Sequence, residues 1–138
     1  LANLYNSGGH RKITPDEYET IKKYLQKFPE SMHIRAAFII ASEAIYSPSA
    51  EYKRVPDKII NKAKQWSEQY PKKIEFQEAY FGLLFSRLKY AQAQDMRNEQ
   101  RRVYREMKTV AERANYSEYN ESNQLMESVD ILHRVFGY

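Results

Sequence analysis

The feature that most constrains the fold is a helix ending that recurs when the chain is shifted on itself by 42 positions. Each copy has an aromatic residue, its neighbour, a second aromatic residue and a proline at the same spacing: Tyr24, Leu25, Phe28 and Pro29, then Trp66, Ser67, Tyr70 and Pro71. Proline lacks a backbone donor and clashes with the preceding turn, so each copy predicts the end of a helix. A repeat of this length indicates a helical hairpin that recurs along the chain.

The residues after each proline match at the same shift. The matching positions are Met32, Ile34, Ala37 and Phe38 in the first copy and Ile74, Phe76, Ala79 and Tyr80 in the second. A further shift of 44 aligns the second copy with a third helix end at Arg113-Ala114-Asn115, which has no proline. A unit of helix, chain-breaking residue and helix therefore occurs about three times. We expect the units to stack, because one hairpin alone cannot bury its second apolar face.

The clearest helix start is the run Thr14-Pro15-Asp16-Glu17. Thr14 is placed to accept a hydrogen bond from the third helical N–H, and Glu17 is placed to return one, as in a capping box. Pro15 suits the first helical position, where a missing donor costs nothing. A helix therefore begins at Pro15.

Apolar residues at helical spacing predict further helices along the rest of the chain. The expected helices cover about 15–28, 31–46, 56–70, 73–94, 95 or 98 to 114, and 117–136. The second and fourth are apolar on more than one side, as is typical of buried inner helices. Asp95 or Asn98 would cap the fifth helix, and Gly137 would end the sixth. Residues 1–9 resemble the last turns of a further helix.

The sequence therefore predicts an all-α fold of about six helices, stacked as antiparallel pairs in one domain over residues 1–138. No stretch shows the alternation typical of strands. The alternative is a compact six-helix bundle in which the similarity between helices is accidental. The chain begins with Leu1 rather than methionine, so we expect a domain excised from a larger protein.

Composition narrows the class of protein further. Aromatic residues make up 14% of the chain, which argues against disorder. There is no cysteine, and hence no disulfide framework or Cys-based zinc site. No apolar run approaches the length needed to span a bilayer, and no signal peptide is visible, so a cytoplasmic location is favoured. The net charge of +4 is too mild for a dedicated nucleic-acid domain.

The two proline-ended repeats give the chain a family resemblance. With Tyr24-Leu25 before Pro29 and Trp66-Ser67 before Pro71, it resembles the tetratricopeptide-like (TPR-like) helical repeat family. Its period of 42 to 44 is longer than the roughly 34 residues of that family. The resemblance implies a stack of helix pairs that serves as a protein-binding scaffold, adaptor or regulatory domain.

Residues for catalysis or cofactor binding are not grouped in the sequence. His10, His33 and His133 lie far apart, and none belongs to a helical zinc-binding motif. Glu75 and Glu78 lie one turn apart, but no Glu-x-x-His accompanies them, so a solvated pair is favoured over a di-metal site. The sequence therefore predicts a protein that is not an enzyme and holds no metal or cofactor.

Five residues are candidates for binding a partner: Arg35, Ile39, Gln77, Phe81 and Phe85. Phe81 and Phe85 lie off the main apolar stripe of their helix, and a shift of 42 aligns Phe81 with Ile39. If the first helix of each pair lines a concave side, an exposed strip there would form a peptide-binding groove, with Arg35 and Gln77 fixing register. The alternative is that the two phenylalanines pack between neighbouring units.

A second candidate is a basic stripe on the fifth expected helix, formed by Arg97, Arg101, Arg105 and Lys108. Such a stripe can hold an acidic peptide or phosphates. The alternative is an ordinary solvated face. The leading hypothesis is a protein–protein interaction scaffold, with a homodimer or a sensing role in a regulator among its forms. A nucleic-acid-associated domain using the stripe is the second hypothesis, although nucleic acid is the less favoured partner.

Overall fold

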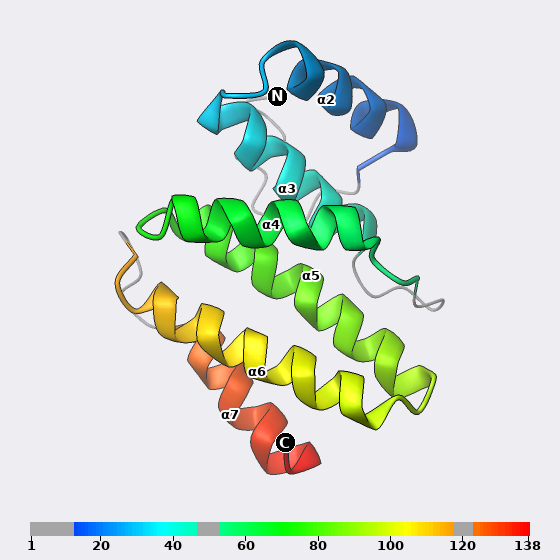
Figure 1. Cartoon of the computed structure of the whole chain (residues 1–138), viewed down its shortest axis with the longest axis vertical. Coiled ribbons are helices and arrows are strands. Elements are labelled where there is room, and N and C mark those ends of the chain that lie inside the picture. The colour runs from blue at the N-terminus through cyan, green and yellow to red at the C-terminus, as the bar shows by residue number, and fades with distance from the viewer. Residues whose placement is uncertain (1–12, 47–52, 118–122) are drawn as a thin grey trace.

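The computed structural model describes residues 13–46, 53–117 and 123–138. In these ranges the chain forms six α-helices and no strand (Figure 1), which confirms the predicted all-α fold. The helices are α2 (Pro15–Lys27), α3 (Met32–Tyr46), α4 (Asp57–Gln69), α5 (Ile74–Ala93), α6 (Arg97–Ala114) and α7 (Gln124–Phe136). The helix end expected in residues 1–9, His10 and most of the loop before Val55 lie outside the described residues.

Helix α2 begins as the sequence predicts. The Thr14 hydroxyl accepts a hydrogen bond from the Glu17 backbone N–H at 3.1 Å, and the Glu17 carboxylate accepts one from the Thr14 N–H at 3.3 Å. Pro15 occupies the first turn. Two donors that the helix cannot satisfy internally are therefore paired by side chains that lie three residues apart.

Each helix packs against the next in three consecutive pairs, α2 with α3, α4 with α5, and α6 with α7. Contacts of α5 with α3 and α6 join the pairs, and α3 also meets α4. In Figure 1, α4 and α6 lie in front of α5 and α7. Helix α5 is therefore the centre of the fold, because it meets a helix of every pair: α3, α4 and α6.

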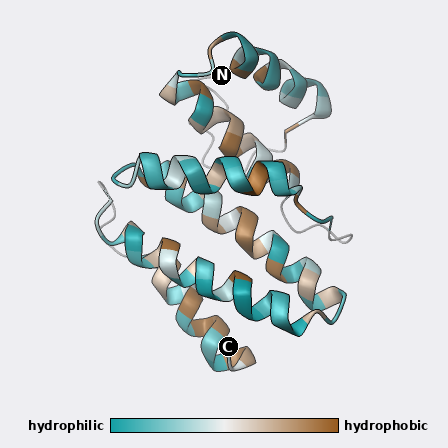
Figure 2. Cartoon of the chain, in the orientation of Figure 1, coloured by the Kyte–Doolittle hydropathy of each residue, from teal (hydrophilic) through white to brown (hydrophobic). Residues whose placement is uncertain are grey.

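The apolar residues of α5 face neighbours on several sides. Phe76, Tyr80, Leu83 and Leu88 have almost no exposed surface and lie in one continuous core with residues from the other helices. Figure 2 shows the complementary pattern on α4 and α6, whose surfaces toward the viewer are mostly hydrophilic. The prediction that the fourth helix would be an inner helix is confirmed, since no single apolar stripe could satisfy all of its neighbours.

The proline-ended repeat is reproduced in the backbone. Helix α2 ends at Phe28 with φ −130° and ψ 65°, and α4 ends at Tyr70 with φ −119° and ψ 61°. In each case the N–H of the capping residue donates to a carbonyl four residues earlier, on Tyr24 or Trp66, at 2.8 Å. The third helix end differs, because Asn115 keeps helical angles of −57° and −27°.

The start of α6 differs from both expected caps. Its N-cap is Met96, which makes no side-chain cap, because Asp95 is used to end α5 instead. Asp95 has a left-handed φ of 53°, and its N–H donates to the Gln92 carbonyl while the Met96 N–H donates to the Ala91 carbonyl. This is the Schellman ending of a helix, with aspartate where glycine is commoner.

Helix α7 begins later than expected and ends as expected. The sequence placed its start after Ser117, whereas the helix begins at Gln124 and is capped by the Asn123 side chain, which accepts from the Met126 N–H at 3.1 Å. Gly137 follows the last turn with φ 71° and is the predicted C-cap. Only a residue without a Cβ adopts this conformation at no steric cost.

Candidate functional site

A groove of about 650 Å³ lies between α2, α3 and α4. Its apolar floor comes from all three helices: Tyr18 and Leu25 on α2, Phe38 on α3, and Ile59 and Trp66 on α4. The site is thus a product of three helices rather than of one motif.

Three aromatic rings run across this floor from α2 to α4. The Tyr18 and Phe38 rings meet edge to face with centroids 5.7 Å apart, and the Phe38 and Trp66 rings do the same at 6.2 Å. The Tyr18 hydroxyl lies 2.6 Å from the Ser42 hydroxyl. Burial raises the pKa of Tyr18 to about 12, although the hydrogen bond with Ser42 opposes the shift. The phenol therefore stays neutral, and the floor is rigid and apolar.

Cationic side chains surround the floor. Lys22, Arg35, Lys58 and Lys62 line the groove, and no aspartate or glutamate of the described chain does so. The Lys22 ammonium lies 4.5 Å from the centre of the Tyr18 ring, and the Lys62 ammonium lies 5.4 Å from that of Phe38. Burial, followed by the charge of Lys58, lowers the pKa of Lys62. The groove therefore combines an apolar floor with a basic rim.

Arg35, predicted to contact a partner, lies in the wall of this groove. Its Nε donates to the Pro29 carbonyl at 2.7 Å, and its Nη1 donates to the Gln69 side chain and the Tyr70 hydroxyl at 3.1 and 3.2 Å. The guanidinium lies 5.2 Å from the centre of the Trp66 ring. Arg35 therefore ties the turn after α2 to the end of α4 while it adds charge to the groove.

Gln77 lies in the core and not on a binding face. Its exposed fraction is 0%, and its Nε2 donates to the carbonyls of Ser67, Tyr70 and Lys73 at 3.1, 3.0 and 3.3 Å. Its Oε1 pairs with the Ser67 hydroxyl, which also accepts from Arg113 on α6 at 2.6 Å. Gln77 thus joins the end of α4 to the start of α5, and one of its acceptors, the Ser67 carbonyl, lies in the last turn of α4, where a helix has no internal donor.

The expectation of an exposed strip of Phe81 and Phe85 on α5 is wrong for Phe81, and the matching candidate Ile39 on α3 is also buried. Ile39 is 0% exposed and Phe81 is 6% exposed, and both belong to the continuous core. Phe85 is half-buried, and the Lys89 ammonium lies 5.2 Å from its ring centre and 5.9 Å from that of Phe136. These residues pack between helices, which was the alternative that the sequence left open.

The predicted basic stripe is exposed on α6. Arg97, Arg101, Arg105 and Lys108 all face away from the core. Arg97 lies 3.7 Å from the Asp95 carboxylate, and among the described residues no ion pair involves the other three. The half-buried Glu99 and Glu106 lie on the same helix. The stripe is therefore a solvated surface, and two of its members, Arg97 and Arg101, also line a small open cavity of about 430 Å³ beside Tyr138.

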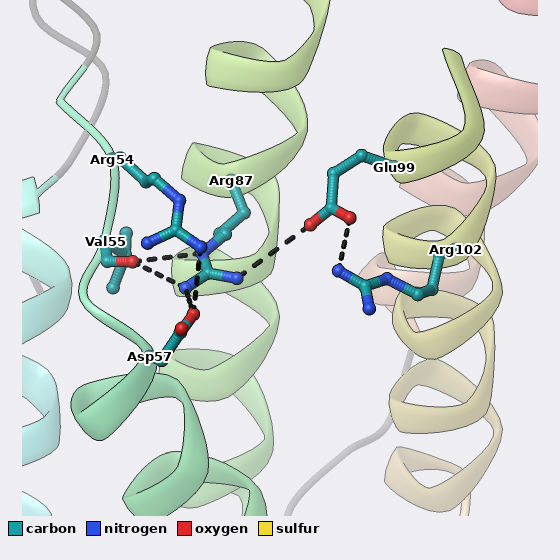
Figure 3. A network of polar contacts seen from close by, with 6 residues as sticks. All are labelled: Arg54, Val55, Asp57, Arg87, Glu99 and Arg102. Atoms are coloured by element: carbon teal, nitrogen blue, oxygen red, sulfur yellow. Dashed lines mark hydrogen bonds and ion pairs between the residues drawn. The ribbon is translucent and has the colours of Figure 1, made fainter. Parts of the chain in front are cut away.

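A buried arginine on α5 joins three parts of the chain (Figure 3). Arg87, 7% exposed, donates through Nε and Nη2 to the Val55 carbonyl at 3.0 and 2.8 Å and pairs with Asp57. Its Nη1 lies 3.9 Å from Glu99 on α6. Arg87 lowers the pKa of the Asp57 carboxyl by hydrogen bonding and by its charge. The network is structural, since the arginine donates to groups that hold α4, α5 and α6 together.

The described residues show neither a metal-binding group nor a membrane-spanning helix. In that part of the chain, no three or more His, Cys, Asp or Glu residues form a group that could hold a metal ion. None of the helices seen there has both the length and the apolar character required to cross a membrane. The groove is therefore the feature from which a function is argued.

The groove was not predicted from the sequence. Tyr18, Phe38 and Trp66 have the spacing of core positions, and the sequence does not say that one edge of each ring borders an opening. A usable signal was the run Lys58, Lys62 and Trp66, which places two cations and the only tryptophan on one face of α4.

In comparisons with known proteins, no family model, curated protein or solved structure matches the chain.

Proposed function

We propose that this chain is a protein–protein interaction module that holds a peptide segment of a partner in the groove between α2, α3 and α4. The observation that carries the proposal is the groove itself, about 650 Å³ in volume, with Tyr18, Phe38 and Trp66 across its floor. Peptide-binding grooves join an apolar floor, which supplies affinity, to polar groups at the rim, which fix register.

The repeat supports the same function. The equivalent helix ends at Phe28 and Tyr70 give α2 and α4 similar entries into the helices that follow them. The resemblance to TPR-like repeats, which rests on these positions, would make the chain a scaffold or adaptor, and homodimers are among the assemblies such scaffolds form. The groove differs from the strip first expected, because it opens between α2 and α4 and leaves Phe81 in the core.

The proposal is tested by selecting a displayed library of random twelve-residue peptides on the immobilised chain. Trp66 is the only tryptophan and lines the groove, so its fluorescence reports occupancy by peptides that lack tryptophan. We expect enriched peptides to bind and to change the Trp66 emission. If no sequence class is enriched over a blank surface, the proposed function is wrong.

A matched pair of variants locates the binding. Gln65 lines the groove on α4, whereas Asn61, one turn earlier, is exposed and lies outside the groove. Gln65→Tyr should narrow the opening and weaken the selected peptide by about tenfold, a loss of about 1.4 kcal/mol. Asn61→Tyr should leave the affinity unchanged. Equal affinities for both variants would place the binding site elsewhere.

A second function rests on the exposed stripe of α6, with Arg97, Arg101, Arg105 and Lys108. Three of these residues have no ion pair among the described residues, which leaves their charge available to phosphates. Binding to nucleic acid through the stripe would weaken steeply with salt. A titration with a labelled duplex and a labelled single strand at low salt tests this function, and no binding to either would reject it.

A further inference from the structure

We propose that the partner segment is acidic as well as apolar, with an apolar anchor on the groove floor and carboxylates on both sides of it. The inference rests on the proposed function and adds the chemical class of the ligand. The carboxylates would meet Lys22 on the α2 side and Lys58 and Lys62 on the α4 side.

The charge of the groove lining is of one sign. Its four charged residues are Lys22, Arg35, Lys58 and Lys62, and no acidic residue of the described chain lies among them. Lys22 has a partner in Glu19 at 3.0 Å, on the exposed side of α2. Arg35 donates only to neutral groups in the contacts described above. Apart from Lys22, the cations of the groove therefore have no carboxylate partner in the described chain.

The acidic residue next to Lys58 in the sequence is already paired with other cations. Asp57 directly precedes Lys58, but its carboxylate pairs with Arg87 and with Arg54 at 3.0 Å. No ion pair of the described residues involves Lys58 or Lys62. These two lysines lie one helical turn apart, a spacing at which like charges repel. A carboxylate from outside would relieve that repulsion.

The positions of the lysines over the rings define the order of groups in the ligand. The Lys22 ammonium lies over the Tyr18 ring at one end of the aromatic floor, and the Lys62 ammonium lies over the central Phe38 ring from α4. An apolar anchor seated on this floor therefore has cations on both sides. Partial burial makes the ammonium of Lys62 gain more from a carboxylate than a fully solvated lysine would.

The geometry of the rings favours a peptide over a nucleic acid. Base stacking requires exposed ring faces, whereas the Phe38 and Trp66 side chains are 4% and 6% exposed and meet edge to face. What borders the groove is the edge of a packed core, which fits aliphatic or aromatic side chains. Charge alone would attract both classes, but this floor matches the peptide.

The experiment compares selections from the random twelve-residue library on two forms of the chain. On the wild-type chain we expect enriched sequences with Asp or Glu on both sides of a Leu, Ile or Phe. On the Lys58→Gln/Lys62→Gln variant the enrichment of acidic residues should be lost. Lys64→Gln is the matched control, because Lys64 is exposed on α4 outside the groove and its loss should change nothing.

The best peptide is then synthesised in two forms, one with its Asp and Glu residues changed to Asn and Gln. We expect the amide form to bind about tenfold more weakly, and the difference to shrink in high salt. Lys62→Glu should reverse the preference, favouring the amide form. Trp66 fluorescence and thermal unfolding of each variant show that the groove is still folded.

The possible failures are distinguishable. If no peptide is selected on any form of the chain, the proposed function itself is wrong. If peptides are selected but the acidic and amide forms bind equally, the groove binds peptides and the charge inference is wrong. A twelve-nucleotide single strand that competes better than the acidic peptide, with the same lysine dependence, would also overturn the inference.

Discussion

The turns after α2 and after α4 have the same backbone but different surroundings. In each turn the preceding helix is capped by an aromatic residue, and the backbone angles of the two caps are nearly equal. Each turn is also held by a side chain six or seven residues after the carbonyl to which it donates, Arg35 in the first turn and Gln77 in the second. The first turn lies at the edge of the stack, where Arg35 covers Trp66 and borders an open groove. The second lies beneath α6, where Arg113 closes over Ser67.

The difference shows that equivalent positions in a repeat share a structural role but not access to a partner. Arg35 and Gln77 both donate to carbonyls at the end of the preceding helix, and this role follows from the repeat. Only Arg35 also reaches a surface, because it is half-buried and lines the groove, whereas Gln77 is fully buried. A binding role is therefore argued for the first unit and not for the second.

The largest test of this comparison is Phe81→Ala in the second unit. Because Phe81 is almost fully buried, the loss of its ring should lower the free energy of unfolding by about 4 kcal/mol. Phe85→Ala should cost much less, since Phe85 is only half-buried. Urea unfolding followed by circular dichroism measures both. Equal and small losses of unfolding free energy for the two variants would mean that Phe81 lies on an exposed surface, as the sequence first suggested.

The second test removes Arg87, an arginine of the second unit that has no counterpart in the first. A shift of 42 aligns Arg87 with Ile45, so the buried network belongs to the second unit alone. Arg87→Met should lower the free energy of unfolding by about 3 kcal/mol, because Val55 and Glu99 lose a buried partner.

The Arg87→Met variant should also change the pH dependence of stability. In the wild-type chain the pKa of Asp57 is lowered by Arg87, so the contribution of this carboxylate is present above its ordinary pKa and is lost as pH falls through the lowered value. As the pH falls from 5 to 2, a range about the usual carboxyl pKa, the variant should lose less stability than the wild-type chain, as measured by thermal unfolding. An unchanged pH profile would contradict the network.

The third test compares the two turns directly. Gln77→Leu removes the side-chain donor to two carbonyls at the end of α4 and to one at the start of α5, and should cost about 2 to 3 kcal/mol. Arg35→Leu, in the more open turn, should cost about 1 kcal/mol because water can replace its hydrogen bonds. Chemical unfolding of the two variants gives the difference. A larger loss for Arg35→Leu would reverse our ranking of the turns.

The smallest effect is expected at Glu43 on α3, which aligns with Phe85 at a shift of 42. Glu43 packs so closely on Gly82 of α5 that a Cβ there would overlap its side chain. Burial, and then the charge of Glu78, raises the pKa of Glu43. Its favourable contribution is therefore complete below the ordinary glutamate pKa and is lost as pH rises through the raised value.

Glu43→Gln should accordingly raise the melting temperature slightly at neutral pH and have no such effect in acid. Thermal unfolding at both pH values checks the prediction. Glu112→Gln, at an exposed position of α6, serves as a control for the same change of net charge. A melting temperature that falls at neutral pH would mean that the ionised Glu43 stabilises the fold.

Local signals in the sequence predicted the helices well. The Thr14 capping box, the helix ends before Pro29 and Pro71, and the Gly137 C-cap each depend on residues within one or two turns. The predicted N-cap of α6 was wrong, because Asp95 can either cap α6 or serve as the left-handed residue that ends α5. Sequence alone does not decide such a competition.

The candidate site was predicted only in part, for a different physical reason. An inner helix such as α5 is apolar on several faces, and the sequence cannot say which faces are covered, so Phe81 was wrongly placed on a surface. The groove is lined by residues from α2, α3 and α4, which lie far apart in the sequence. How these helices pack together is not visible in the sequence, and only Arg35 among the lining residues was predicted to contact a partner.

The side chains that donate to carbonyls near the helix ends also affect how such a chain can be lengthened by duplication. Arg35, Gln77 and Asn123 each stand at the start of the helix that follows a turn, and each donates back to the helix before it, at Pro29, Ser67 and Ala111 respectively. A hairpin that is duplicated or deleted as a whole therefore carries its own donor and leaves no carbonyl stranded. Gene duplication could lengthen this protein one hairpin at a time, whereas a break inside a hairpin would separate each of these carbonyls from its side-chain donor.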